Sequence, residues 1–465
     1  MKNNSVWWES MFLGRQKELS ELKKAFASKS KTAVLVYGKR RVGKSTLIRE
    51  ASRSFDGVVI NHLCVKSTFE GNLAHLSRSV CNALDLPQVE FHALLDVFDF
   101  LKKQKKPILL VLDEYQYLKE SLADGAVDSY MQIVVDSLPA NVKLVFCGSY
   151  IAIMKELLKE SNPLFGRLSH IISVEEFDYL DASLFYPKLS IRDKIMMYAV
   201  FGGSPYVLSL LDFDKSAVEN IENLLVEDNS LLRTHVENVV LREIQKAYDV
   251  RILEALGNGK KRYSEIRNRL GGNDSGLLDK QLKNLMNMDV VAKIFPINKP
   301  NDKKKVFYEI RDNLMRFYFA YIFGQEALIS KFGDKAFVKR NVLPSLRTFV
   351  SLRFENMALQ YFARLARSGN LDGCEDFGSF WYDDLRNKTN GQFDCVLKNA
   401  DGYDFFEVKY YDSPMSRKEC EKEELQVRAV AEVACRSVGF VCSSGFDFKS
   451  RKYRLITGKE IYECC

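Results

Sequence analysis

The chain has 465 residues, a length that suits two to four domains. Its composition, 46% hydrophobic and 28% charged, is typical of a folded protein. Its net charge is only +7, which is too small by itself to indicate a polyanionic partner. No uncharged apolar run of about 18 residues occurs, and the first residues do not resemble a signal peptide. We therefore expect a cytoplasmic protein without a membrane span, whose ten scattered cysteines are reduced thiols.

The first motif is the segment Gly38–Ser45, with the sequence GKRRVGKS, which matches the phosphate-loop pattern G-x-x-x-x-G-K-[ST]. The apolar residues 32–37 before it predict a strand, and the residues from Ser45 onward predict a helix. In that context the backbone N–H groups of the loop bind phosphates, Lys44 reaches the β- and γ-phosphates, and Ser45 ligates Mg²⁺. We predict an ATP site formed by Gly38, Lys39, Arg40, Arg41, Val42, Gly43, Lys44, Ser45 and Thr46.

A second apolar run, 107–112, ends in the two carboxylates Asp113 and Glu114 and predicts a parallel strand buried on both faces. Asp113 would then hold Mg²⁺, and Glu114 would polarise the water that attacks the γ-phosphate. A third predicted strand, 142–148, leads to Ser149, whose hydroxyl is a candidate sensor of the γ-phosphate. The plain alternatives are an acidic turn in solvent and a serine that only caps a strand.

Strands predicted near 32–37, 57–63, 107–113 and 142–148 alternate with helical stretches, which indicates parallel βαβ units. The motifs LGRQKEL, GKRRVGKS, ILLVLDEYQYL, VFCGSY, NPLFGR and GGSP, in this order, resemble the archaeal-type ATPases of the STAND/AAA+ superfamily. The resemblance covers about the first half of the chain. It implies that Arg167 reaches the γ-phosphate, in cis or from a neighbouring subunit of a homo-oligomer. It also implies that the GGSP segment belongs to a helical lid; without the family, Arg167 is an ordinary surface cation.

After about residue 246, three short helices are predicted at 251–256, 263–270 and 277–285. Two apolar segments follow, around 290–297 and 306–310, separated by a basic loop. This arrangement resembles a winged helix, in which the third helix enters the major groove of DNA and the wing, Lys303–Lys305, meets phosphates. The segment Gly257–Arg311 holds 13 Lys/Arg against 6 Asp/Glu, an excess equal to the whole net charge of +7. A module that serves only as a connector or a protein contact is the alternative.

Near the C-terminus, residues 391–398 and 403–410 predict two strands joined by a turn. A turn centred on Ala400 and Asp401 places Asp394 opposite Glu407, with Lys409 on the same face. A slip of two residues would instead oppose Asp394 to Lys409 and keep the shared face. Two carboxylates, Asp394 and Glu407, beside an ammonium suit a divalent metal at a phosphate-cleaving site, and Glu355 on an upstream helix could supply a further acid.

The series Glu355, Asp394, Glu407-Val-Lys409 resembles the signature of the PD-(D/E)xK nuclease superfamily, as do Phe380–Trp381 and Gln426. The resemblance implies a restriction-endonuclease-like α/β domain with catalytic Glu355, Asp394, Glu407 and Lys409. Two departures are Phe393, where the family has an acidic or small residue, and a missing proline near the aspartate. A solvated Asp–Glu–Lys cluster formed by chance is the alternative.

Together these observations predict an α/β protein with a P-loop NTPase parallel sheet (1–181), a helical lid (182–245), a winged-helix domain (246–318) and a restriction-endonuclease-like domain (319–465). The expected function is ATP binding and hydrolysis coupled to nucleic-acid binding or cleavage, with DNA as the partner and ATP and Mg²⁺ as cofactors. The alternative is a STAND-type regulatory switch with protein partners and a catalytically inactive C-terminal scaffold. A small-molecule kinase is a third option, but the sequence shows no recognisable acceptor site.

Overall fold

The computed structural model describes residues 12–228, 230–239, 249–272, 275–384, 389–430 and 434–463. The chain forms two compact units: unit 1 comprises Met1–Glu176 with Ser204–Tyr206, and unit 2 comprises Phe177–Gly203 with Val207–Cys465. The predicted end of the lid, 240–245, and the final Cys464–Cys465 pair lie outside the described residues. None of the helices in the described parts of the chain combines the length and apolar character that a membrane crossing needs.

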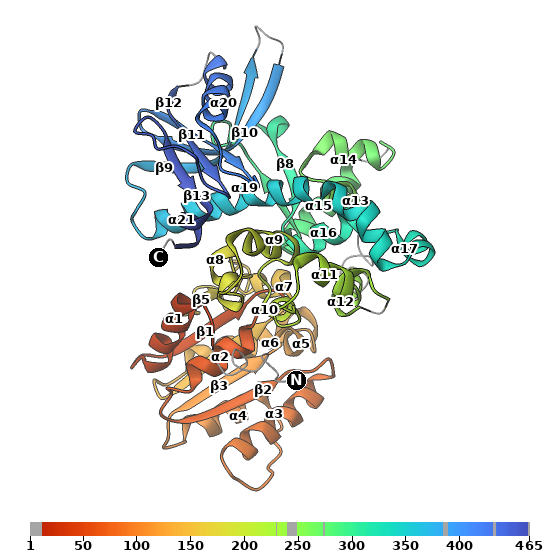
Figure 1. Ribbon diagram of the computed structural model, residues 1–465. Coiled ribbons are helices and arrows are strands. Elements are labelled where there is room, and N and C mark those ends of the chain that lie inside the picture. The colour runs from red at the N-terminus through yellow and green to blue at the C-terminus, as the bar shows by residue number, and fades with distance from the viewer. Residues whose placement is uncertain are drawn as a thin grey trace. The chain divides into compact units, whose positions relative to one another are not determined.

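Unit 1 is built on a five-stranded parallel sheet with the strand order β2-β3-β4-β1-β5 (Figure 1). Four strands confirm the predicted ones, and β5 is added at one edge; their bounds are β1 (Thr32–Tyr37), β2 (Val58–Leu63), β3 (Ile108–Asp113), β4 (Val142–Gly148) and β5 (His170–Ser173). Every residue of β1 and β4 is buried, which explains why these strands are continuous apolar runs rather than alternating ones.

Helices cover both faces of this sheet, and alternate residues of β1 point to opposite sides. Val34 and Val36 pack with α1 (Gln16–Ala27) and α2 (Lys44–Ser52). Ala33 and Leu35 pack in a second core, whose helices are α3 (Phe69–Ala83), α4 (Leu94–Lys102), α6 (Ala126–Asp136) and α7 (Ile151–Glu156). Between β3 and α6 lie the short α5 (Gln116–Lys119) and a 3₁₀ turn, Ala123–Gly125. The parallel strands all end at the edge that carries the phosphate loop, as the βαβ pattern predicted.

Unit 2 begins with helices where the lid was expected: α8 (Tyr179–Ala182), a 3₁₀ turn (Ser183–Phe185), α9 (Ile191–Phe201), α10 (Pro205–Leu208, whose first two residues belong to unit 1), α11 (Ala217–Ile221), a π-helical turn (Glu222–Val226) and α12 (Leu231–Val239). Asp178 caps α8 and also accepts two hydrogen bonds of 2.6 Å from Arg364 on α19 (Leu343–Arg367). The Asn313 side chain donates to the Tyr198 carbonyl at 2.8 Å. These contacts tie the first helices of the unit to its later part.

A helix-turn-helix region follows, with the predicted three helices and two strands and one further short strand. Its elements are α13 (Arg251–Gly257), β6 (Lys261–Arg262), α14 (Tyr263–Arg269), α15 (Ser275–Asn287), β7 (Val291–Ile294), a 3₁₀ turn (Lys303–Lys305) and β8 (Phe307–Ile310). The strands form an antiparallel sheet in the order β6-β8-β7. Four helical segments lead on to α19: α16 (Asn313–Tyr321), α17 (Glu326–Phe332), α18 (Asp334–Phe337) and a π-helical turn (Val338–Val342).

The loop between β7 and β8 packs on a later strand rather than projecting as a free wing; the contact of Lys303–Lys305 with phosphates stays a prediction. The Asn298 side chain donates to the Trp381 carbonyl at 2.7 Å and accepts from the Trp381 N–H at 3.0 Å. Lys305 lies 3.1 Å from Asp383 and 4.2 Å from the centroid of the Trp381 ring. These partners come from a strand far along the chain, so local sequence does not reveal them.

The C-terminal part of unit 2 is a mixed five-stranded sheet, with the order β13-β12-β11-β10-β9 (Figure 1). Its elements are β9 (Cys374–Asp384), β10 (Thr389–Asn399), β11 (Gly402–Lys409), α20 (Arg417–Ala429), β12 (Cys435–Cys442), β13 (Arg454–Thr457) and α21 (Gly458–Glu463). The β10–β11 hairpin has the predicted register, because Cys395 lies opposite Phe406 and Asn399 opposite Gly402. A bulge interrupts the pairing of β10 with β9 between Phe393 and Val396, so Asp394 sits at a bend of its strand.

Candidate functional site

The phosphate loop connects the end of β1 at Tyr37 to the start of α2 at Lys44. Gly38 has no room for a side chain, since an added Cβ would lie 2.0 Å from the Val174 carbonyl oxygen. Gly43 adopts a φ of 91°, which is the left-handed region that glycine tolerates best. Both glycines of the motif are therefore required by the backbone path itself.

Lys44, Ser45 and Asp113 meet at the carboxyl edge of the sheet. The Lys44 ammonium is buried and donates to the carbonyls of Gly38 at 2.9 Å and Lys39 at 2.8 Å, and burial lowers its pKa. The Ser45 hydroxyl donates to the Asp113 carboxylate at 2.8 Å, and Ser45 and Thr46 are exposed. A hydroxyl and a carboxylate so close together are oxygen donors of the kind that Mg²⁺ prefers.

Glu114 is held by its neighbours in a left-handed conformation with φ 53°. Its carboxylate accepts from the Ser149 hydroxyl at 2.7 Å, from the Ser149 N–H at 3.3 Å, and from the Gln116 side chain. A left-handed glutamate next to a phosphate loop is local strain of the kind found at functional sites. Gln116 is a site residue that the sequence reasoning missed, although it stands inside the DEYQYL motif.

The two arginines of the phosphate loop contact tyrosine side chains of unit 1. Arg40 donates to the hydroxyls of Tyr117 and Tyr150, each at 3.0 Å. The Arg41 guanidinium lies 3.9 Å from the centroid of the Tyr206 ring. A Cβ on Gly43 would lie 3.8 Å from the Pro205 ring, which is ordinary van der Waals contact. The GGSP turn therefore touches the phosphate loop.

Arg15 is a second residue that the sequence reasoning missed. It is only 7% exposed, and its guanidinium donates to the Val42 carbonyl at 2.8 Å and to the Glu175 carbonyl at 2.6 Å. The LGR motif before α1 was the available signal, and a buried arginine that holds two carbonyls explains it. Arg15 fixes the phosphate loop from behind.

Arg167 lies far from the place that a cis role requires. Its Nε donates to Asp136 at 2.9 Å, and its NH1 donates to the Pro163 carbonyl at 3.0 Å. Two residues later, Ser169 bonds to Ala33 near the start of β1, whereas the phosphate loop follows the end of β1. Arg167 thus lies at the amino-terminal ends of the strands, whereas the phosphate loop lies at their carboxyl ends. This corrects the cis alternative, and the prediction that it acts on a neighbouring subunit is the one that stays.

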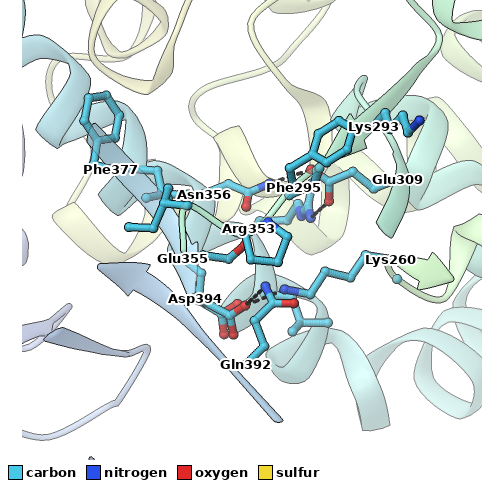
Figure 2. Close-up of a pocket in the computed structure, with 18 of the residues that line it drawn as sticks. Lys260, Lys293, Phe295, Glu309, Arg353, Glu355, Asn356, Phe377, Gln392 and Asp394 are labelled. Atoms are coloured by element: carbon cyan, nitrogen blue, oxygen red, sulfur yellow. Dashed lines mark hydrogen bonds and ion pairs between the residues drawn. The ribbon is translucent and has the colours of Figure 1, made fainter. Parts of the chain in front are cut away.

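In unit 2, the predicted acids and lysine converge from three elements: Glu355 from α19, Asp394 from β10, and Glu407 and Lys409 from β11. Lys409 lies 2.6 Å from Glu407 and 3.5 Å from Glu423 on α20. Asp394 accepts from the Gln392 side chain at 3.0 Å and from the ammonium of Lys260, just before β6 (Figure 2). The sequence reasoning missed Lys260 and Glu423. Gln426, named only as a feature that suits the nuclease family, is exposed on α20.

The carboxylates of this cluster influence one another strongly. Burial raises the pKa of Glu355 from its ordinary value of 4.5 to about 8, and the charges of Asp394 and Glu407 add to this effect. Burial also raises the pKa of Glu407, against the lowering effect of Lys409. Among the described residues, no three His, Cys, Asp or Glu side chains are grouped as a metal site would need. Lysine ammonium groups, rather than further acids, balance the carboxylates.

Comparisons with known proteins address the parts of the chain separately. Residues 12–211 match a family described as an ATPase domain predominantly from Archaea, and residues 243–313 match an HxlR-like helix-turn-helix family. Residues 318–423 match a family of archaeal and bacterial proteins described as of unknown function. The chain therefore carries an ATP-binding, ATPase-like region of the archaeal type, followed by a helix-turn-helix region.

Several individual proteins are similar to the chain. An uncharacterized protein of Methanocaldococcus jannaschii is 26% identical over 412 residues, covering 86% of this chain and 88% of the relative. An uncharacterized ATP-binding protein of the same organism is 28% identical over 187 residues, covering 34% of this chain and 50% of the relative. The structure of the Walker-type ATPase of Pyrococcus abyssi has a TM-score of 0.49 and 19% identity, covering 66% of this chain and 96% of that one.

The raised pKa of Glu355 predicts how stability depends on pH. Because the folded state binds this proton more tightly than the unfolded state, the contribution is fully present below about pH 4.5 and is lost as pH rises toward 8. Replacing Glu355 by Gln should flatten this decline by at most about 1.4 kcal/mol per pH unit. Urea unfolding of the full chain at a series of pH values, with EDTA present, measures the difference.

Glu254 on α13 is an exposed acid, so Glu254→Gln is a matched control that should keep the wild-type slope. If wild type and Glu355→Gln lose stability equally between these pH values, Glu355 is not a buried, protonated carboxyl.

Proposed function

We propose that this protein hydrolyses ATP and couples its nucleotide state to nucleic acid bound by unit 2. The four-part division at 181, 245 and 318 belongs to this proposal. The observation that carries the ATPase part is the hydrogen bond of 2.8 Å between Ser45 and Asp113, beside the buried ammonium of Lys44. These residues would hold Mg²⁺ and the β- and γ-phosphates, where the ion neutralises phosphate charge.

Glu114 is the proposed base in this reaction, and Ser149 is its positioning partner. The Ser149 hydroxyl and the Gln116 amide both donate to the same carboxylate oxygen of Glu114, Oε2, so they fix the orientation of the carboxylate, and Oε1 is the oxygen that would accept a proton from water. A γ-phosphate that draws the Ser149 hydroxyl away would change this orientation and make hydrolysis sensitive to the bound nucleotide, since Ser149 is also the candidate sensor. Arg167 would complete the site of an adjoining subunit in a homo-oligomer.

The path from the phosphate loop to unit 2 is covalent. The chain leaves unit 1 after Glu176, returns for Ser204–Tyr206, and leaves again. The returning segment contacts the phosphate loop through the Tyr206 ring against the Arg41 guanidinium, and Pro205 lies beside Gly43. A nucleotide that reshapes the loop would therefore pull directly on α9 and α10, the proposed lid.

For unit 2 we propose DNA binding through the helix-turn-helix region and a PD-(D/E)xK-like fold for the C-terminal sheet. On α15, Lys280 and Lys283 are exposed on the helix that would enter a major groove. The mixed sheet, with Glu355, Asp394, Glu407 and Lys409 in mutual electrostatic contact, supports the nuclease-like part. The catalytic roles of these four residues belong to the same proposal.

The alternative, a STAND-type switch with an inactive C-terminal scaffold, is favoured by one specific observation. Both carboxylates proposed to hold a metal already have lysine partners, Asp394 with Lys260 and Glu407 with Lys409. Ammonium groups so placed neutralise the carboxylates, so the cluster needs no metal ion to balance its charge.

Lys44→Ala should weaken ATP binding by about 100-fold or more, because the only buried ammonium at the phosphate loop among the described residues is removed. Titration with a fluorescent ATP analogue measures the affinity. Lys31→Ala, an exposed lysine just before β1, is the control and should bind as wild type does. Unchanged affinity in Lys44→Ala would rule out the phosphate-loop assignment.

Glu114→Gln should bind ATP normally and lose about 100-fold or more in turnover, since the amide cannot act as a base. Phosphate release at saturating ATP and Mg²⁺ gives the rate. Glu120→Gln, an exposed acid in the same segment, should hydrolyse as wild type does. Wild-type turnover in Glu114→Gln would remove Glu114 from the mechanism.

Asp394→Asn should abolish Mn²⁺- or Mg²⁺-dependent cleavage of plasmid or single-stranded DNA, assayed on gels with and without ATP. Asp401→Asn is the control, because Asp401 lies in the exposed turn of the same hairpin with a side chain 69% exposed. If the wild-type chain cleaves no DNA under any of these conditions, the switch is the better description.

A further inference from the structure

A cavity of about 710 Å³ lies inside unit 2, where the helix-turn-helix region meets α19 and the strands β9 and β10 (Figure 2). One wall comes from the helix-turn-helix region, with Lys260, Lys293 and Phe295. The adjoining wall carries Glu355 and Asp394, the proposed catalytic acids, and Asp394 meets Lys260 where the two walls join. Its volume is in the range of pockets that hold a small ligand or one unit of a polymer.

The helix-turn-helix wall presents an exposed cation beside an exposed aromatic ring. Lys293 is exposed, Phe295 is 37% exposed, and the Lys293 ammonium lies 5.0 Å from the centroid of the Phe295 ring. Neither side chain belongs to the buried core, so their packing does not explain their presence here. A cation for phosphate and an open ring for stacking are what proteins use to bind unpaired nucleotides.

The deeper wall holds buried polar groups with spare bonding capacity. Glu309 is bound by Arg316 at 2.9 Å and by Arg353 at 3.1 Å, and the two arginines are only 2% and 3% exposed. The Nε atoms of both arginines and the hydroxyl of Ser379, all on lining residues, have no partner among the described residues. These donors lie within the wall rather than on its surface, so the wall is polar and held in place by the arginine–glutamate pairs.

The pair formed by Lys260 and Asp394 can open at low cost. Their side chains are 30% and 32% exposed, and ion pairs of that exposure contribute only about 0–1 kcal/mol. A phosphodiester can therefore replace Asp394 as the partner of Lys260, which brings the phosphate next to the acids. No covalent change is needed for this exchange.

We propose that this cavity binds an unpaired nucleotide of a single-stranded nucleic acid, with its phosphate at Lys260, its base on Phe295, and the backbone of the neighbouring nucleotide at Lys293. In a duplex the base faces are covered by stacking, so they are not available to Phe295. The inference rests on the proposed nucleic-acid function and names the substrate class of the same site. Duplex binding through α15 is a separate contact that does not use the cavity.

The test is fluorescence anisotropy of a fluorescein-labelled oligothymidine, alone or annealed to oligoadenosine, titrated with the full chain in EDTA. Phe295→Ala and Lys293→Met should each weaken binding of the single strand by about tenfold and leave duplex binding unchanged. Both positions are exposed, and equal thermal midpoints will show that the variants fold. Lys335→Met is the matched control, because Lys335 is an exposed lysine on α18 of the same unit that does not line the cavity.

Selective loss of single-strand affinity in both cavity variants supports the inference. Wild-type single-strand affinity in both variants overturns it, and duplex binding that Lys280→Ala weakens would then leave the proposed function in place. If the wild-type chain binds neither probe, the inference and the nucleic-acid part of the proposed function both fail.

Discussion

The docking of the β7–β8 loop on strand β9 is the constraint on which the arrangement of unit 2 depends. Asn298 satisfies both backbone groups of Trp381, and Ile297 adds a backbone bond of 2.8 Å to Ser379. Trp381 is 2% exposed and lies beneath the cations of Arg262 and Lys305, at 4.6 and 4.2 Å from its ring centroid. These contacts join the helix-turn-helix region to the mixed sheet. As a result, Lys260 lies next to Asp394, and residues from both parts line the cavity. With Lys299 and Lys305 of this loop paired to Asp383, the proposed duplex contact is assigned mainly to α15.

On the nucleotide side, the corresponding constraint is that the phosphate loop is held from two directions. Arg15 binds the Val42 carbonyl on one side, while the Tyr206 ring contacts Arg41 on the other, next to Pro205. The second contact belongs to a three-residue segment whose neighbours on both sides are part of unit 2. Within unit 2, α9 packs on α16 and on α19, the helix that carries Glu355. In the proposed coupling, a displacement of α9 would pass to α19 because packed cores deform little.

The sequence predicted the features that depend on residues close together in the chain. The phosphate loop follows from its glycines and flanking elements, and the β10–β11 register follows from a two-residue turn at Ala400–Asp401. The helix-turn-helix elements follow from apolar spacing. The sequence did not reveal partners that meet only in three dimensions: Gln116 with Glu114, Lys260 with Asp394, and Asp383 with Lys305. Arg167 shows the same limit, since a motif assigns a residue to a site but does not place it at an edge of the sheet.

The charges around Asp394 bear on whether the C-terminal sheet can serve as a metal-dependent nuclease or only as an inactive scaffold. The raised pKa of Glu355 keeps that carboxyl largely protonated at neutral pH, so Asp394, Glu407 and Glu423 are the acids that Lys260 and Lys409 balance. Such a cluster is close to neutral and offers a divalent cation little attraction while both lysines stay in place. Lys409 is fixed on the same strand as Glu407, but Lys260 belongs to another module and is held only by a half-exposed ion pair. A phosphate that draws Lys260 away would leave Asp394 unpaired and make the cluster more acidic. The affinity of the cluster for a divalent cation would then depend on bound nucleic acid. Any cleavage at this site would therefore require that nucleic acid bind first.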